Sequence, residues 1–155
     1  MRSLMKVAVA VAVLAPVQAN AETGNIPFNG TIADTCAITV LSAGTIVPNA
    51  GYTVLSSTFA GGAAGTANIM ATGTGWDVSA DNPAAFSAAP ASAAGTTFAT
   101  TYDLGGATTA TGVTGATTTA LNNGQTNVSV DLTATHPSGS FEAGTYTATV
   151  VLRCE

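Results

Sequence analysis

The strongest constraint on the fold is the alternation of apolar and polar residues, which repeats every two residues. Apolar and polar residues alternate in several stretches, whereas no helical period persists over a useful length in residues 22–155. Gly, Asn and Pro separate the strand-like runs, as they do in turns. About eight short strands at fairly regular spacing are typical of an all-β sandwich or barrel. The predicted strands cover residues 37–41, 45–47, 52–59, 66–71, 75–80, 97–104, 126–135 and 144–155.

The regions between these strands differ in composition. Residues 72–74 are predicted to form a turn that pairs the strands on either side of it. Residues 81–95 are rich in Ala, Pro and Ser and are predicted to be a loop. The Thr/Ala/Gly tract 108–119 contains one strongly apolar residue, so it is either a poorly specified edge strand or a mobile loop. The lone Trp76 alternates with Val78 and is expected in the core, the alternative being an exposed platform for a ligand.

The stretch 24–36 carries an apolar ridge. One face of an extended chain would present Ile26, Phe28, Gly30 and Ile32. A glycine inside such a ridge weakens a strand and often marks a place where another backbone comes close.

The stretch 144–155 carries the matching pattern, since one of its faces would present Tyr146, Ala148, Val150, Leu152 and Cys154. No further element follows it to cover its edge. We therefore expect the ridge at 24–36 to supply the missing strand to another copy of the fold.

The first 21 residues have the features of a signal peptide. Arg2 and Lys6 precede an apolar run over residues 7–17, and Ala19-Asn20-Ala21 is a small-x-small cleavage site. The alternative is a retained membrane anchor, but a helix needs about 20 apolar residues to span a bilayer. The predicted organisation is therefore a signal peptide at 1–21, an N-terminal donor strand at 22–33 and a β-sandwich domain at 34–155.

Charge excludes some classes of partner. Cleavage after Ala21 would leave one basic residue, Arg153, against eight acidic residues, and hence a net charge of −7. Nucleic acids and anionic membrane surfaces attract clustered Lys and Arg. We therefore expect neither nucleic acid nor membrane insertion for the mature chain.

Two cysteines, Cys36 and Cys154, each lie on an apolar ridge. An even count in an exported chain predicts one disulfide, and the alternative is two unpaired core thiols. A bridge between them would close a loop of over a hundred residues, which is worth about 4 to 5 kcal/mol in the chain-entropy model.

Groups for catalysis are sparse. The single histidine, His136, lies in a turn-like stretch, with Ser138, Ser140 and Asp131 near it in sequence, but no serine has the context of a nucleophile elbow. Acidic residues are scattered singly, so no calcium site is predicted. One histidine and two cysteines that are expected to be bridged cannot form a zinc site. We expect a structural or binding protein that is not an enzyme and uses no cofactor.

The two ends of the chain resemble subunits of chaperone–usher pili, the fimbrial family of Gram-negative bacteria. That family's N-terminal extension has the pattern apolar-x-Phe-x-Gly-x-apolar, matched here by residues 26–32, with Cys36 following in the first strand. The family's last strand has the pattern Gly-x-Tyr-x-Ala-x-apolar, matched by residues 144–150. The spore-coat-U-like and archaic branches also end in such strands. In the commonest members the second cysteine lies in the second strand, whereas here it is penultimate.

The resemblance implies an immunoglobulin-like β-sandwich that lacks its last strand. A periplasmic chaperone would first cover the groove, and the N-terminal strand of the next subunit would then replace it at an outer-membrane usher. Cell-surface fimbriae that support adhesion would result. Ile26, Phe28 and Ile32 would fill pockets, and Gly30 would lie where the groove is too shallow for a side chain. The alternative is a self-contained secreted β-sandwich that binds a sugar or a protein, in which residues 24–33 pair within their own domain.

Overall fold

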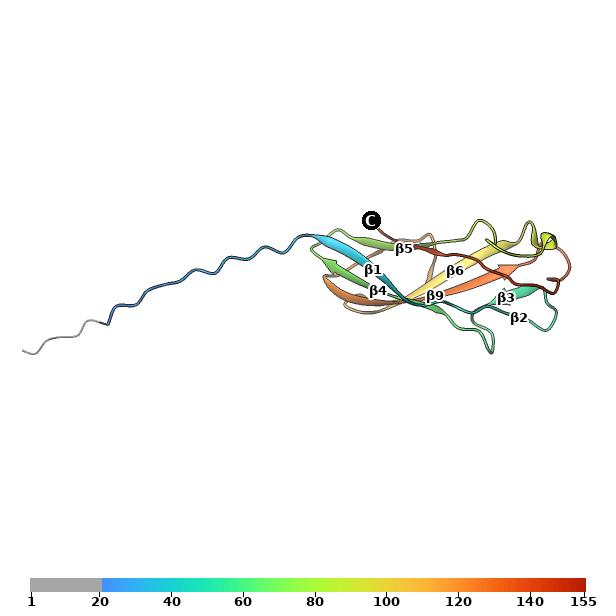
Figure 1. Cartoon of the computed structure of the whole chain (residues 1–155), viewed down its shortest axis with the longest axis horizontal. Coiled ribbons are helices and arrows are strands. Elements are labelled where there is room, and N and C mark those ends of the chain that lie inside the picture. The colour runs from blue at the N-terminus through green and yellow to red at the C-terminus, as the bar shows by residue number, and fades with distance from the viewer. Residues whose placement is uncertain (1–20) are drawn as a thin grey trace, which may run out of the picture. The chain divides into compact units, whose positions relative to one another are not determined.

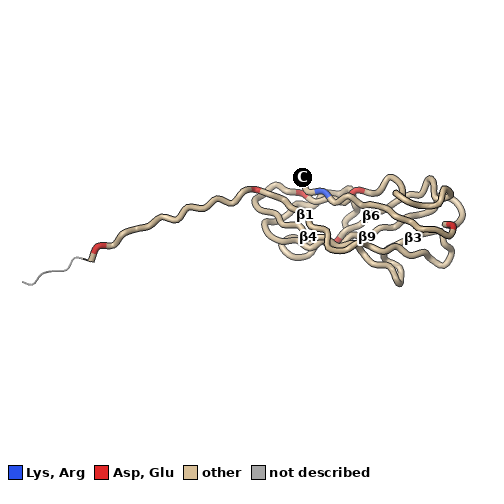
Figure 2. The backbone as a smooth tube through the Cα atoms, viewed as in Figure 1, with Lys and Arg blue, Asp and Glu red and all other residues tan. Residues whose placement is uncertain are grey.

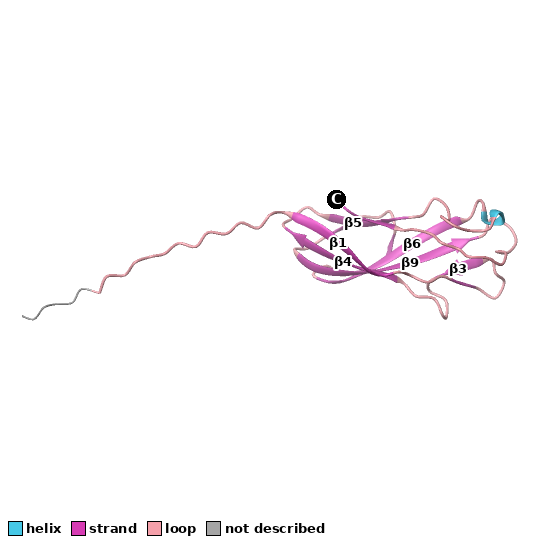
Figure 3. Ribbon diagram, viewed as in Figure 1, coloured by secondary structure: helices cyan, strands magenta, loops and turns pink. Residues whose placement is uncertain are grey.

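The computed structural model describes residues 21–155, so the predicted signal peptide, apart from Ala21, lies outside the described residues. The chain divides between Thr31 and Ile32 into an N-terminal part and a folded unit. The folded unit is all β, with one short 3-10 turn, η1 (Figures 1 and 3). Its elements are β1 (Thr35–Ser42), β2 (Val47–Pro48), β3 (Val54–Ser56), β4 (Gly65–Thr72), β5 (Asp77–Asp81), η1 (Ala91–Ala93), β6 (Thr97–Gly106), β7 (Ala110–Thr114), β8 (Thr119–Ala120), β9 (Gly124–Thr135) and β10 (Val151–Cys154).

Two antiparallel sheets form the unit. In the larger sheet the long strand β9 pairs on one side with β4 and β3, and on the other side with β6. Strands β1, β2 and β7 extend this sheet beyond β4, β3 and β6. The smaller sheet has the order β10-β5-β8. This arrangement is consistent with the predicted β-sandwich.

The core lies between the two sheets and follows the alternation of the sequence. In β9, Val128, Leu132 and Ala134 are buried, as the period-two pattern predicts. The main cluster takes Val78 and Ala80 from the smaller sheet and packs them against residues of the larger sheet: Ala67, Ile69, Ala71, Tyr102, Leu104 and Val128. Charged residues are few along the whole unit (Figure 2), so burial of these apolar faces is the main stabilising term.

Two local predictions, at residues 72–74 and 52–59, were wrong or too long. The turn at residues 72–74 does not join a hairpin, because β4 pairs with β1 and β9 while β5 belongs to the other sheet. The strand predicted over 52–59 shrinks to β3, since Tyr52 adopts a positive φ of 55°. The side-chain Oδ1 of Asn49 accepts hydrogen bonds from the N–H groups of Thr53 and Val54, which fixes a turn there. Within the tract 108–119, β7 and the start of β8 are strands, and β7 is an edge strand.

Tyr102 offers a test of the core. Its side chain is 1% exposed, and its hydroxyl donates to the carbonyl of Thr117 at 2.7 Å, with the Val78 carbonyl at 3.1 Å and the Thr119 hydroxyl at 2.8 Å. Tyr102→Phe would leave buried acceptors without a donor, so we expect a loss of about 1 to 3 kcal/mol in the free energy of unfolding. The control is Tyr52→Phe at a side chain that is 57% exposed, where a change below about 0.5 kcal/mol is expected. Equal effects in denaturant titrations would contradict this account.

Candidate functional site: a groove between two sheet edges

A groove of about 630 Å³ lies between the edges of the two sheets. Within the described residues, β1 pairs only with β4 and β10 pairs only with β5, so both strands are edges. One wall comes from β1 and the loop after it, the other from the chain that leads into β10, and β4 and β9 contribute further lining residues. An uncovered pair of apolar edges is a feature that soluble proteins normally avoid.

The C-terminal wall presents alternate side chains to this groove. The residues concerned are Tyr146, Ala148, Val150 and Leu152, which all line the groove and are half-buried. The odd-numbered residues between them are exposed. The structure therefore brings the four predicted residues together on one wall.

The backbone of this wall is also free on the groove side. Thr147 donates its N–H to the carbonyl of Ala88 at 2.8 Å, and Glu155 exchanges two hydrogen bonds with Asp77 at 2.7 and 3.0 Å. Because backbone groups of successive strand residues point to opposite edges, the even-numbered residues direct theirs into the groove. Within residues 21–155, no backbone hydrogen bond involves Tyr146, Ala148 or Val150. An added strand would satisfy these groups.

The predicted strand 144–155 is correspondingly short. Only β10, Val151–Cys154, forms regular ladder pairs, whereas Thr147 makes an isolated bridge to Ala88. The reason is that the facing residues 82–90 form a loop, which offers residues 144–150 one isolated bridge and no ladder, and no strand pairs with them on the groove side. Residues 144–150 are extended, but their backbone groups on the groove side have no hydrogen-bond partner among the described residues.

The opposite wall was not predicted from the sequence as part of a site. Ile38 and Val40 of β1 face the groove together with Ile46. Val40 remains 74% exposed, although Cys36 and Ile38 on the same face of β1 are half-buried. The signal in the sequence was the apolar ridge on which Cys36 lies, because Ile38 and Val40 continue it at alternate positions.

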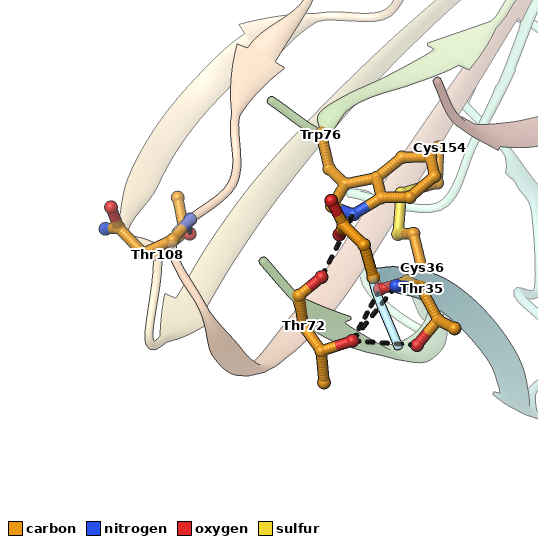
Figure 4. The surroundings of a disulfide bond; sticks show 8 residues. Thr35, Cys36, Thr72, Trp76, Thr108 and Cys154 are labelled. Carbon is orange, nitrogen blue, oxygen red and sulfur yellow. Dashed lines mark hydrogen bonds between the residues drawn. A yellow bond between two sulfur atoms is a disulfide. The ribbon is translucent and has the colours of Figure 1, made fainter. Parts of the chain in front are cut away.

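One end of the groove is closed by the predicted disulfide. Cys36 in β1 and Cys154 in β10 are bonded, with their Cα atoms 6.3 Å apart, and this prediction is confirmed. Trp76 lies beside the bridge and is partly buried against the main core (Figure 4). Its indole N–H donates to Oδ1 of Asp34 at 2.8 Å, so the ring is held in place rather than presented as a free platform.

An ion pair also holds β10 to the smaller sheet. Nε of Arg153 donates to Oδ2 of Asp81 at 2.5 Å. This hydrogen bond and the charge of Asp81 raise the pKa of the Arg153 guanidinium. Both side chains are exposed, and such pairs add little to stability.

The other end of the groove is bordered by aromatic side chains. Tyr146 packs edge-to-face against Phe86 and Phe141, with ring centroids 5.3 and 5.2 Å apart, and Phe98 packs against Phe86. The hydroxyl of Tyr146 donates to the carbonyl of Glu142 at 2.6 Å. This end of the wall is therefore fixed before any occupant arrives.

The N-terminal segment, by which we mean residues 21–34, carries the predicted ridge in an uncovered state. Residues 21–34 form neither strand nor helix. The side chains of Ile26, Phe28 and Ile32 are 78%, 93% and 85% exposed, and no atom lies within 4 Å of where a Cβ on Gly30 would be. Three large apolar side chains at alternate positions are thus exposed to water together.

The polar groups considered for catalysis do not converge on one another in the described part of the chain. Nε2 of His136 lies 3.0 Å from the carbonyl of Ser92, and its Nδ1 accepts from the N–H of Ser138 at 3.3 Å. Asp131 instead accepts from the hydroxyl of Ser57 at 2.6 Å. Among residues 21–155 no three His, Cys, Asp or Glu side chains are grouped so as to hold a metal ion. No helix in this range is long and apolar enough to cross a membrane.

Comparisons with protein-family models, with curated proteins and with solved structures found no match to this chain.

Proposed function

We propose that this protein is a structural subunit of an exported fimbria, and that it polymerises by placing its N-terminal segment in the groove of a second copy. The observation that carries the proposal is the agreement between segment and groove. The segment presents four alternate positions over residues 26–32, and the groove wall presents four over residues 146–152. Seven strand residues span about 23 Å, so the two match in length as well as in period.

The energetics favour such an exchange. An added strand would hydrogen-bond to the free edge groups of β1 and of the C-terminal wall, and its alternate side chains would enter the groove. Burying Ile26, Phe28 and Ile32 would contribute about 1.5 to 3 kcal/mol for each side chain. Gly30 would face a part of the groove where a side chain has no room. The predicted donor strand at 22–33 and the incomplete immunoglobulin-like sandwich at 34–155 are both parts of this proposal.

Head-to-tail contact of this kind does not close on itself, so it produces a filament. The remaining parts of the proposal follow from the resemblance to chaperone–usher pilus subunits. Residues 1–21 would be removed on export, a periplasmic chaperone would protect the groove, and an outer-membrane usher would assemble the subunits into adhesive fimbriae on the cell surface. The small number of charged residues in the mature chain suits packing against copies of itself.

Peptide rescue tests the groove. A chain that lacks residues 22–32 should be stabilised by a synthetic peptide of residues 22–33, because a ligand at 100 times its Kd adds about 2.7 kcal/mol to the stability of the state that binds it. The matched control is the same peptide with Phe28→Asp, which should give no shift in the melting temperature. An unchanged melting temperature with the native peptide would contradict the proposal.

The second candidate is the self-contained binding module. Tyr52, which is 57% exposed in a turn, is the side chain that favours it. If full-length and truncated chains both run as monomers on unboiled denaturing gels, and truncation merely lowers stability, this candidate replaces the first.

A further inference from the structure

The groove has a closed end, and this end lies at the start of the chain's own β1. Cys36 is the second residue of β1, and its Cα lies 6.3 Å from that of Cys154. A strand placed between two others needs two strand spacings, or about 9.6 Å. The disulfide therefore leaves no room for a third strand between β1 and β10 at this point.

The chain's own segment has only one route into its own groove. Two residues, Ala33 and Asp34, separate Ile32 from β1. A two-residue link spans at most about 7 Å, whereas the open end beyond Tyr146 lies about seven strand residues, or 23 Å, from the closed end. The segment would have to reverse at residues 33–34 and run back along β1, through the gap that the disulfide closes.

Contacts around the disulfide hold residues 33–35, which connect the segment to β1, away from that route. Trp76 donates its indole N–H to Asp34, and the hydroxyl of Thr72 donates to the carbonyl of Ala33 at 2.7 Å. The N–H of Thr35 donates to the same hydroxyl at 3.0 Å (Figure 4). Thr72 belongs to β4, which borders β1 on the side opposite the groove. We call these three contacts the latch: two of them hold residues 33 and 35 on Thr72 of β4, and the third ties Asp34 to Trp76 beside the disulfide.

We infer that the disulfide and the latch make the groove selective for the segment of a second copy, by excluding the segment of the same chain. This inference rests on the proposed function. Exclusion matters because a tethered segment has an effective concentration in the millimolar range. At micromolar protein, an unobstructed segment would fill its own groove about 1,000 times more readily than a neighbour's, and filament growth would stop.

Photo-cross-linking of the full exported chain tests the inference directly. p-Benzoylphenylalanine is placed at position 28, chains labelled with ¹⁴N and ¹⁵N are mixed before assembly, and cross-linked peptides are identified by mass. In the oxidised protein we expect cross-links from position 28 to residues 146–152 to join different chains, with mixed-isotope pairs present. The control is the same cross-linker at position 29, on the other face of the segment, which should not reach the groove.

Weakening the closed end should reverse this preference. In Cys36→Ser/Cys154→Ser/Asp34→Ala, we expect cross-links within one chain to become the major product and the ratio of multimer to monomer to fall at least tenfold. Cross-links within one chain in the oxidised parent would overturn the inference, as would a folded variant that cross-links only between chains. If the variant does not fold, the oxidised parent alone decides. If position 28 reaches the groove in neither form, the proposed function itself fails, and the inference fails with it.

Discussion

Phe28→Asp should abolish multimers of this protein while leaving its folded unit intact. Phe28 is 93% exposed in the N-terminal segment, so replacing it by Asp removes almost no buried surface within the chain. In the proposed fibre the same side chain would be buried in an apolar groove. Truncating a buried Phe costs about 3 to 5 kcal/mol, and burying an unpaired carboxylate adds to that cost. Each 1.4 kcal/mol weakens association tenfold, so we expect a loss of at least about 100-fold to 1,000-fold.

The measurement is the pattern of multimers on unboiled denaturing gels, together with the thermal transition of the monomer. Asn29→Asp is the matched control, since it adds the same charge one residue away on the opposite face of the segment. We expect Asn29→Asp to retain the ladder and Phe28→Asp to lose it. If both variants keep the ladder, the segment does not join the subunits through this ridge.

Removal of the disulfide should produce the largest loss of stability. Cys36 and Cys154 are 118 residues apart in sequence, so their bridge restricts nearly the whole folded unit in the unfolded state. The chain-entropy model gives about 4 to 5 kcal/mol for such a loop. For a domain of this size that corresponds to a fall in melting temperature of roughly 10 to 20 °C. Cys36→Ser/Cys154→Ser should show this fall in the Phe28→Asp background, where no segment fills the groove.

Reduction supplies the control for that substitution. A reductant should lower the melting temperature of the oxidised parent toward that of the double serine variant and should leave the variant unchanged. A parent whose transition does not respond to complete reduction would show that the bridge contributes little.

Sequence patterns predicted the strands of this chain better than their partners. The alternation in β6 and β9 marked their buried faces correctly, because one face of each packs in the core. The same alternation occurs in residues 26–32, which form no strand here, since a strand needs an edge to pair with. Alternation reports a face that can be buried, and it carries no information about which chain buries it.

The sheet partners depend on tertiary structure and were missed for that reason. A short link such as residues 72–74 favours a hairpin locally, yet it passes from one sheet to the other because β4 is paired on both sides by β1 and β9. The groove wall over residues 146–152 was predicted from its alternation, whereas Ile46 and Val40 opposite it were not. Ile46 lies in a loop that has no period, and the alternation in β1 that includes Val40 does not by itself indicate a groove. The bridge between Cys36 and Cys154 was predictable because only two cysteines are present.

Mixing two complementary variants tests the central claim most directly. Phe28→Asp would have an intact groove and a defective segment, whereas Ala148→Trp would have an intact segment and a groove filled by its own side chain. Each variant alone should be monomeric by light scattering. An equimolar mixture should form a one-to-one dimer and nothing longer, because the dimer has neither a competent segment nor an open groove left. No dimer in the mixture, or multimers of either variant alone, would contradict the account.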